Sequence, residues 1–371
     1  MSSTMTMTAP PATTAVHQQA KPLTAEELAW LNDGKQVVSG QLAAQAFGAT
    51  KGNRLQLRLN SPEWMHKLDK DGFVVIPGVI PEEKAKQYAS QAYDWMESWG
   101  LGFDRNDPST WRTENLPFNL RGGIFGRGGM SYQQFVWDIK QDPNVIDKWE
   151  QIWGTKELVT SYDAVNISIP CPRDPNDKLL KPWPHVDQSP LATDLYSVQG
   201  LVNLLPNGPQ DGGLLVLKGS KQLYEEFFRA FDHQKPEGGW PTIDRYDHTP
   251  EQNQWFIDRG CEWVKVCANP GDLVLWDSRT VHYGGLPQRE AERIACYVCF
   301  KPAAFLTPEI KERRLKAWHN RDNTSHDPIT FWVNPFLPPE DHPTYETAKG
   351  REQPEPKLTA RGRQLVGLDE Y

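Results

Sequence analysis

The chain has 371 residues, of which 38% are hydrophobic, and it carries a formal net charge of −8. A chain of this length can bury a stable core without disulfide bonds. Its acidic balance, without a basic patch, argues against nucleic-acid binding, and it holds no run of roughly 18 apolar residues that could span a membrane.

The cysteines and the N-terminal composition favour a cytoplasmic protein. Five cysteines are an odd and small number, which is typical of a reducing compartment. Residues 1–20 are rich in Ser, Thr, Pro and Ala and lack the cationic start and apolar run of a secretory signal. Cys296 and Cys299 form a CxxC motif, but on a strand they would point to opposite faces, so we expect separate core thiols.

The first half of the chain predicts helices around one short strand. Apolar residues recur at helical spacing in several segments, and proline stands at a favoured early position of one of them. We expect these elements to form a helical buttress over residues 23–157. In chain order they are a disordered tail over 1–22, a helix over 24–31, a helix within 56–71, a strand over 73–76, a helix from 81, a long loop over 100–131 and a helix over 133–153.

The second half predicts a mainly β fold with flanking helices. Short strands separated by turn signals are typical of a sandwich or barrel, and helices upstream of them would cover one sheet. We expect this core over 158–305, within a single domain 23–305, and a mostly extended segment over 306–371 packed on it. The predicted strands are 161–169, one carrying residues 185 and 187, 197–205, 213–217, 263–267, 273–276 and 293–300, with a helix over 223–231.

One His-x-Asp motif carries the strongest chemical signal. On a strand, His185 and Asp187 would point to the same face, with Val186 turned away. Together with His282 they make two histidines and one carboxylate, a set that leaves half of an octahedral metal open and suits Fe(II) that binds O2. Alone, the pair could be a hydrogen-bonded contact on an edge strand.

Arg293 adds a second signal. It stands at the head of a predicted buried strand, where a guanidinium needs an anionic partner. A dicarboxylate co-substrate with one end on the metal would supply that partner, because the guanidinium fork matches a carboxylate. The alternative is a buried ion pair with a carboxylate of the protein itself.

In these features the chain resembles the Fe(II)/2-oxoglutarate-dependent oxygenases of the phytanoyl-CoA dioxygenase family. The resemblance covers roughly residues 65–305 and includes the order of the metal motif, the later histidine and the arginine. The matching stretches are DGFVVIPGVI at 71–80, PHVD at 184–187, DGGLLVLKGS at 211–220 and PGDLVLWD at 270–277, leading to His282 and Arg293.

The resemblance implies a double-stranded β-helix core in which His185, Asp187 and His282 hold Fe(II). It also implies that 2-oxoglutarate binds the iron, that Arg293 holds its far carboxylate, and that O2 takes the remaining position. The expected reaction oxidises a C–H bond of a small organic molecule and releases succinate and CO2. Asp187 favours oxygenation, since related halogenases lack this carboxylate; desaturation, epoxidation or rearrangement would use the same iron site.

Three polar residues are candidate contacts of the co-substrate. The resemblance suggests Asn166 and Gln199, for which core hydrogen bonding is the alternative, and Thr280 could share the face of His282. Many relatives carry a hydroxyl two residues after the arginine; here that position is Ala295, and Tyr297 is a candidate replacement.

Trp183 and Asp277 are weaker candidates beside the metal motif. Trp183 lies two residues before His185 and could touch substrate or pack in the core. Asp277 is expected to hold a turn through its side chain rather than to bind metal. The remaining histidines, at 17, 66, 233, 248, 319, 326 and 342, are expected to make surface or local contacts.

Two other functions fit the same residues. One is a cupin-like metalloenzyme that binds Fe or Zn without 2-oxoglutarate, and the other is a non-catalytic jelly-roll binding protein. A neutral substitution of Arg293 would separate the first of these from an oxygenase that uses 2-oxoglutarate. The expected partner is a small-molecule substrate, and a homodimer is compatible with the chain.

Overall fold

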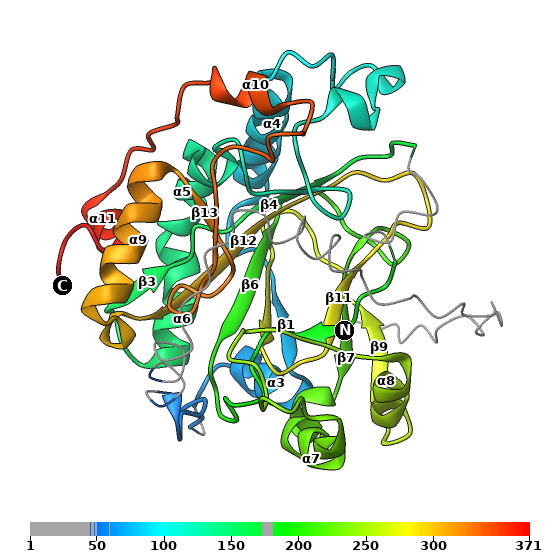
Figure 1. Cartoon of the computed structure of the whole chain (residues 1–371), viewed down its shortest axis with the longest axis vertical. Helices are drawn as coiled ribbons and strands as arrows, with labels where there is room; N and C mark the ends of the chain where they lie inside the picture. Colours follow the sequence, from blue (N-terminus) through cyan, green and yellow to red (C-terminus); the bar gives the residue numbers. More distant parts are fainter. Residues whose placement is uncertain (1–44, 46–47, 49, 59, 173–180) are drawn as a thin grey trace. The chain divides into compact units, whose positions relative to one another are not determined.

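Two antiparallel β-sheets pack against each other at the centre of the structure (Figure 1). The computed structural model describes residues 45, 48, 50–58, 60–172 and 181–371. The predicted tail over 1–22 and the predicted helix over 24–31 lie outside the described residues.

The larger sheet has the strand order β1-β10-β6-β12-β4-β2, with β3 also paired to β12. Its strands are β1 Phe73–Ile76, β2 Ile124–Phe125, β3 Leu158–Thr160, β4 Val165–Ser168, β6 Val198–Asn203, β10 Leu273–Asp277 and β12 Arg293–Pro302. The smaller sheet has the order β8-β5-β11-β7-β9. Its strands are β5 His185–Val186, β7 Gly213–Lys218, β8 Tyr246–Asp247, β9 Glu262–Lys265 and β11 His282–Gly285. A separate ribbon joins β13 Asn323–Thr324 to β14 Val333–Asn334.

Alternating side chains explain why the larger sheet is covered on both faces. In β10, Val274 and Trp276 point into the layer between the sheets, where they meet Val216 of β7. Leu273 and Leu275 point the other way, into the cluster that the helices cover. The two-residue period of a strand therefore builds two cores at once.

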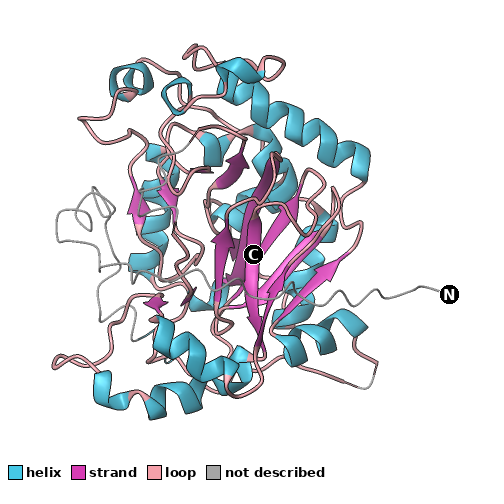
Figure 2. Ribbon diagram, turned by 90° about the vertical axis from the view of Figure 1, so that its right-hand side faces the viewer, coloured by secondary structure: helices cyan, strands magenta, loops and turns pink. Residues whose placement is uncertain are grey.

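Helices cover the outer faces of both sheets (Figure 2). Trp149 of one helix packs on Phe300 of β12, with ring centroids 4.9 Å apart, and its indole N–H donates to the carbonyl of Val198 at 2.8 Å. The smaller sheet is covered by an aromatic cluster around Phe227. The α-helices are α3 Glu63–Asp71, α4 Glu82–Glu97, α5 Gln134–Lys140, α6 Pro143–Trp153, α7 Tyr224–Ala230, α8 Pro250–Ile257, α9 Pro308–Asn320, α10 Tyr345–Lys349 and α11 Ala360–Val366.

The prediction of a mainly β fold with flanking helices and a double-stranded β-helix core is confirmed, although the bounds of several elements differ from the prediction. The helix predicted over 133–153 is two helices, because Asp142 caps a new helix that begins at Pro143. The strand predicted over 161–169 is only β4, since the N–H of Tyr162 donates to the side chain of Thr324 before that strand begins.

Residues 306–371 are not mostly extended, contrary to the prediction. They form α9, α10, α11 and the β13–β14 ribbon. Ile310, Trp318 and Phe331 share a buried cluster with Tyr132 and Trp137. The amphipathic pattern of α9 is weak because charged residues occupy nearly half of its positions, the buried Arg314 among them. Among the described residues, no helix is long and apolar enough to cross a membrane.

Candidate metal centre

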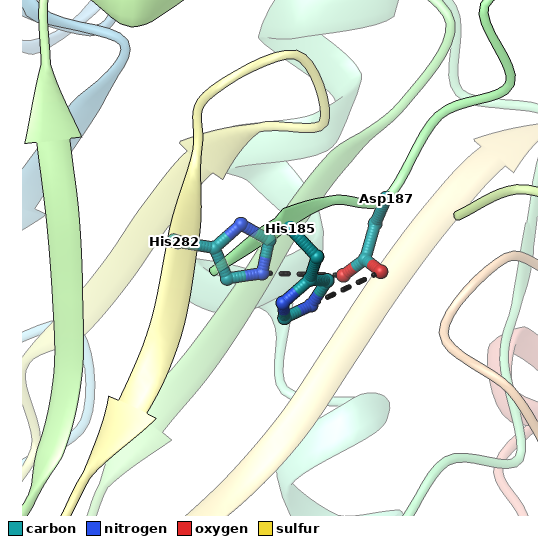
Figure 3. A group of neighbouring side chains, drawn as sticks. All are labelled: His185, Asp187 and His282. Atoms are coloured by element: carbon teal, nitrogen blue, oxygen red, sulfur yellow. Dashed lines mark ion pairs between the residues drawn. The ribbon is translucent and has the colours of Figure 1, made fainter. Parts of the chain in front are cut away.

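Two histidines face each other across neighbouring strands of the smaller sheet (Figure 3). His185 of β5 and His282 of β11 are direct partners in the antiparallel register. Side chains at directly opposite positions lie on one face and within contact distance. The imidazole centroids are accordingly 4.4 Å apart, and both side chains are buried.

Asp187 is the third member, although it lies beyond the end of its strand. Strand β5 ends at Val186, contrary to the prediction that one strand carries both motif residues. The N–H of Asp187 donates to the carbonyl of Ser278 at 3.1 Å, which turns its carboxylate back towards the histidines. Its Oδ1 is 3.3 Å from Nε2 of His185, and its Oδ2 is 3.2 Å from Nε2 of His282.

The three side chains fit a single metal ion. One ligand atom from each lies within 4.8 Å of the others, and no other group of this kind occurs among the described residues. Two imidazoles and one carboxylate occupy one face of an octahedral metal and leave positions for exogenous ligands, the pattern of non-haem Fe(II) oxygenases.

Backbone carbonyls fix the histidines in the form that binds metal. Nδ1 of His185 lies 2.9 Å from the carbonyl of Trp183, and Nδ1 of His282 lies 2.9 Å from the carbonyl of Thr280. A carbonyl can only accept, so each Nδ1 carries the hydrogen and each Nε2 keeps its lone pair for the metal. Burial and the nearby Arg245 lower the pKa of His185 to about 4, which keeps this imidazole neutral at pH 7.

Gln199 orients the carboxylate of the group. Its side-chain amide, on β6, donates to Oδ2 of Asp187 at 2.9 Å. Burial alone would raise the pKa of Asp187, but the neighbouring imidazoles of His185, His326 and His282 lower it well below its usual range. The carboxylate is therefore ionised at neutral pH, as a metal ligand must be.

Arg293 and Asn166 meet at the head of β12. Nη1 of Arg293 donates to Oδ1 of Asn166 at 2.5 Å, and its buried Nε has no hydrogen-bond partner among the residues that the structure describes. Within the described part of the chain, no carboxylate forms an ion pair with Arg293, so the alternative of an internal ion pair is not supported. The guanidinium fits an anion that enters the site.

Two further features shape the surroundings of this guanidinium. Gly213 has φ of +120°, and a Cβ built on it would lie 2.5 Å from Nε of Arg293, so the glycine leaves room for the arginine. The pKa of Lys265 is lowered to about 8, mainly by burial. The positive charge of Arg293 lowers it further, while the thiol of Cys267 acts in the opposite direction. Tyr297, the predicted hydroxyl donor, lies on the same face of β12, and Arg293 opposes the rise in its pKa that burial causes.

Trp183 lies against the metal group. Its ring stacks on the imidazole of His185, with centroids 4.4 Å apart and planes 9° apart. The guanidinium carbons of Arg121 and Arg245 lie 3.8 Å and 4.9 Å from the same tryptophan ring. Both arginines lie in loops, and no sequence motif pointed to a position beside the metal group.

Thr280 and Asp277 hold the turn that leads into β11. The Thr280 hydroxyl, a candidate contact of the co-substrate, donates to the carbonyl of Gly72 at 2.9 Å. The predicted turn role of Asp277 is confirmed: its carboxylate accepts from the N–H of Arg279 at 3.0 Å and from the guanidinium at 2.8 Å and 2.7 Å.

Two of the remaining histidines are more deeply placed than predicted. Nδ1 of His326 lies 4.0 Å from Oδ2 of Asp187. His248 is buried and stacks on Phe227, with ring centroids 4.7 Å apart. Neither histidine belongs to a recognisable sequence motif, so only the folded chain reveals their positions.

Comparison with known proteins agrees with this geometry. Residues 68–293 match the sequence profile described as phytanoyl-CoA dioxygenase (PhyH). "Ava biosynthesis cluster protein O" from Aspergillus versicolor is 34% identical over 283 residues, covering 74% of this chain and 88% of that protein. The crystal structure of GlcNAc Inducible Gene 2 (GIG2) from Candida albicans is similar in fold, with a TM-score of 0.55 and 12% identity, over 89% of this chain and 83% of that chain.

Proposed function

Since the chain belongs to the phytanoyl-CoA dioxygenase (PhyH) family and is a non-haem Fe(II)/2-oxoglutarate-dependent dioxygenase, we propose that it oxidises a C–H bond of a small organic molecule. Succinate and CO2 would be the products of 2-oxoglutarate. The observation that carries the proposal is the buried group of His185, Asp187 and His282, whose ligand atoms lie within 4.8 Å of one another.

The protein's own residues would hold, orient and shield the reactants. Iron and 2-oxoglutarate, when bound, supply the oxidising chemistry by activating O2. His185, Asp187 and His282 would hold the metal, and Arg293 would pair with the far carboxylate of 2-oxoglutarate while Asn166 fixes its fork. Burial of all of these side chains keeps bulk water away from the reacting centre.

The proposed substrate is a small molecule and the proposed compartment is the cytoplasm. The Aspergillus relative is named for a biosynthesis cluster, which supports a small-molecule substrate. All five cysteines are free in the structure, as expected for a reducing environment. Trp183, flanked by Arg121 and Arg245, is the side chain we propose to line the substrate's approach.

The first test is anaerobic titration of the protein with Fe(II) and then 2-oxoglutarate. We expect a visible metal-to-ligand charge-transfer band in the native protein and in His233→Ala, a control at an exposed histidine. His185→Ala should abolish the band, because it removes one of three ligands. A native protein without the band would contradict the proposal; with the band, succinate release over a panel of small molecules would identify the substrate.

The role of Arg293 separates this function from a cupin-like metalloenzyme. Loss of a charge-assisted, buried contact is worth about 1.5–3 kcal/mol, so Arg293→Gln should raise the KM for 2-oxoglutarate roughly 10- to 100-fold. Arg289→Gln is the matched control, since that arginine is 57% exposed and pairs with Asp211. An unchanged KM for 2-oxoglutarate in Arg293→Gln would contradict the role of Arg293, and an activity that is independent of 2-oxoglutarate would favour the cupin-like alternative.

A further inference from the structure

The loop between β13 and β14 lies against the metal centre and is closed by hydrogen bonds at its base. Its two ends are joined by the pairing of Thr324 with Val333 and by hydrogen bonds that connect Ser325 and Trp332, at 3.0 Å and 3.2 Å. This loop lies outside residues 68–293, the part of the chain that matches the family profile.

Inside the loop, a buried ion pair anchors the backbone. Oδ1 of Asp327 accepts from the N–H groups of Ile329 and Thr330 at 2.7 Å and 2.9 Å. Oδ2 of the same residue lies 2.5 Å from Nζ of Lys301 on β12, and both side chains are almost completely buried. The neighbouring residue, His326, is therefore presented from a fixed backbone.

His326 faces the carboxylate of the metal group. Its side chain is 12% exposed, and its Nδ1 lies 4.0 Å from Oδ2 of Asp187, the oxygen that accepts from Gln199. The indole of Trp332 meets the ring edge-on, with centroids 6.3 Å apart. Nε2 of His326 is buried and has no hydrogen-bond partner among the described residues.

This placement is not that of a fourth metal ligand or of a packing residue. The group whose ligand atoms lie within 4.8 Å of one another contains His185, Asp187 and His282, but not His326. A buried imidazole nitrogen without a partner is unfavourable, so a position used only for packing would favour an apolar side chain. The other ring nitrogen, Nδ1, is the one that faces the centre, 4.0 Å from Oδ2 of Asp187.

We propose that His326 is a positioning residue of the metal centre, which together with Gln199 holds Oδ2 of Asp187 and so orients the carboxylate towards the metal. The inference rests on the proposed metal site. The 4.0 Å contact is longer than a hydrogen bond, and such contacts often tighten when a site is filled. Partners of this kind typically contribute 10- to 100-fold to metal affinity.

Co(II) alone is the probe for the test, with the metal-free full chain as the starting material. Its affinity and its visible absorption would be compared for the native protein, His326→Leu, His326→Gln and His319→Gln. His319 is an exposed histidine on α9, in the same C-terminal segment. We expect His326→Leu to bind Co(II) about 10-fold or more weakly with an altered spectrum, His326→Gln to recover part of the affinity, and His319→Gln to match the native protein.

A second measurement tests the shared oxygen. Gln199→Leu and the double variant Gln199→Leu/His326→Leu complete a double-mutant cycle of Co(II) affinity. Because both residues act on one oxygen atom, the loss of affinity in the double variant should differ from the product of the two single losses. Thermal unfolding of each metal-free variant would check that the fold is retained. If His326→Leu does not fold, the Co(II) affinities of His326→Gln and His326→Asn test the role of His326.

The outcomes separate the two proposals. If the native protein binds Co(II) but the His326 variants show the same affinity and spectrum, the role of His326 is wrong and the metal centre stands. Independent, multiplying losses would also overturn the role. A native protein that binds no Co(II) would overturn the metal centre itself.

Discussion

The position of the ring hydrogen on His185 and on His282 determines whether these histidines can bind a metal. Because the carbonyls of Trp183 and Thr280 each accept from an Nδ1, both Nε2 atoms are directed at Asp187 and available to a metal. Each carbonyl belongs to the residue two positions before its histidine. The local backbone therefore selects the tautomer, with no need for a carboxylate partner behind the ring.

His248 gives a prediction at this scale, because it is buried without hydrogen-bond partners for its ring nitrogens among the described residues. Burial, and to a lesser extent His185, lowers its pKa to about 3. Below pH 6.5, the approximate pKa of histidine in the unfolded chain, the unfolded state binds a proton at this residue and the folded state does not. The free energy of unfolding should therefore fall as the pH drops towards 3. Above the unfolded-state pKa both states are neutral and the effect vanishes.

His248→Phe should make the metal-free protein less sensitive to acid. One such histidine lowers the free energy of unfolding by up to about 1.4 kcal/mol per pH unit. The variant would keep the pH dependence that His185 contributes. Urea unfolding at several pH values between 4 and 7 measures the free energy of unfolding. Parallel curves for the native protein and the variant would contradict the assignment.

Among the elements, the long apolar strands were the most predictable from sequence, whereas the short strands β2 and β3 were not predicted. Runs such as residues 273–276 and 293–300 have strong apolar and β-branched character, so their existence and the shared face of Arg293 and Tyr297 could be predicted. Strand β11 could not be, because Gly284 and Gly285 give it no apolar alternation. The metal motif was recognisable from residue types and order, whereas the direct pairing of its two histidines depends on that unpredicted strand.

Gly213, at the start of β7, gives a prediction at the scale of the element. A Cβ at this position would meet Nε of Arg293 at 2.5 Å, and φ of +120° is unfavourable for any other residue. Gly213→Ala should therefore displace the guanidinium and weaken 2-oxoglutarate binding by about 10-fold or more, while Co(II) affinity stays close to native.

The matched control is Gly238→Ala, where an added Cβ meets no atom within 4 Å. Titration of each Co(II)-loaded variant with 2-oxoglutarate, followed by absorption, compares the two. Native-like binding of 2-oxoglutarate by Gly213→Ala would show that the arginine does not need this space.

At the scale of the whole described structure, a buried cation of α9 joins several C-terminal segments to the core, in addition to the Lys301–Asp327 pair. Arg314 of α9 is 1% exposed and donates to the carbonyls of Pro328, Thr160, Leu365 and Val366, at 2.9–3.2 Å. One side chain thus connects the His326 loop, β3 and α11. These contacts join segments far apart in sequence, and no local pattern could have predicted them.

Arg314→Met should destabilise the protein as a whole, because it leaves several buried carbonyls without donors. Each such group costs about 1–3 kcal/mol, so a loss of at least about 2 kcal/mol is expected. Lys316→Met, at an exposed position of the same helix, should change the free energy of unfolding by less than about 0.5 kcal/mol. Equal stability of both variants in chemical denaturation would refute the joining role of Arg314.

The position of the His326 loop also has a consequence for the order in which the protein matures. A ribosome delivers the chain from its N-terminus, so the motif at 185–187 and His282 leave the exit tunnel before residues 323–366 do. A metal ion bound at that stage would lie in a site that has its three ligands but not yet the loop that carries His326. If His326 holds the carboxylate of Asp187 as proposed, full metal affinity would therefore be reached only after residues 323–334 have folded against the site.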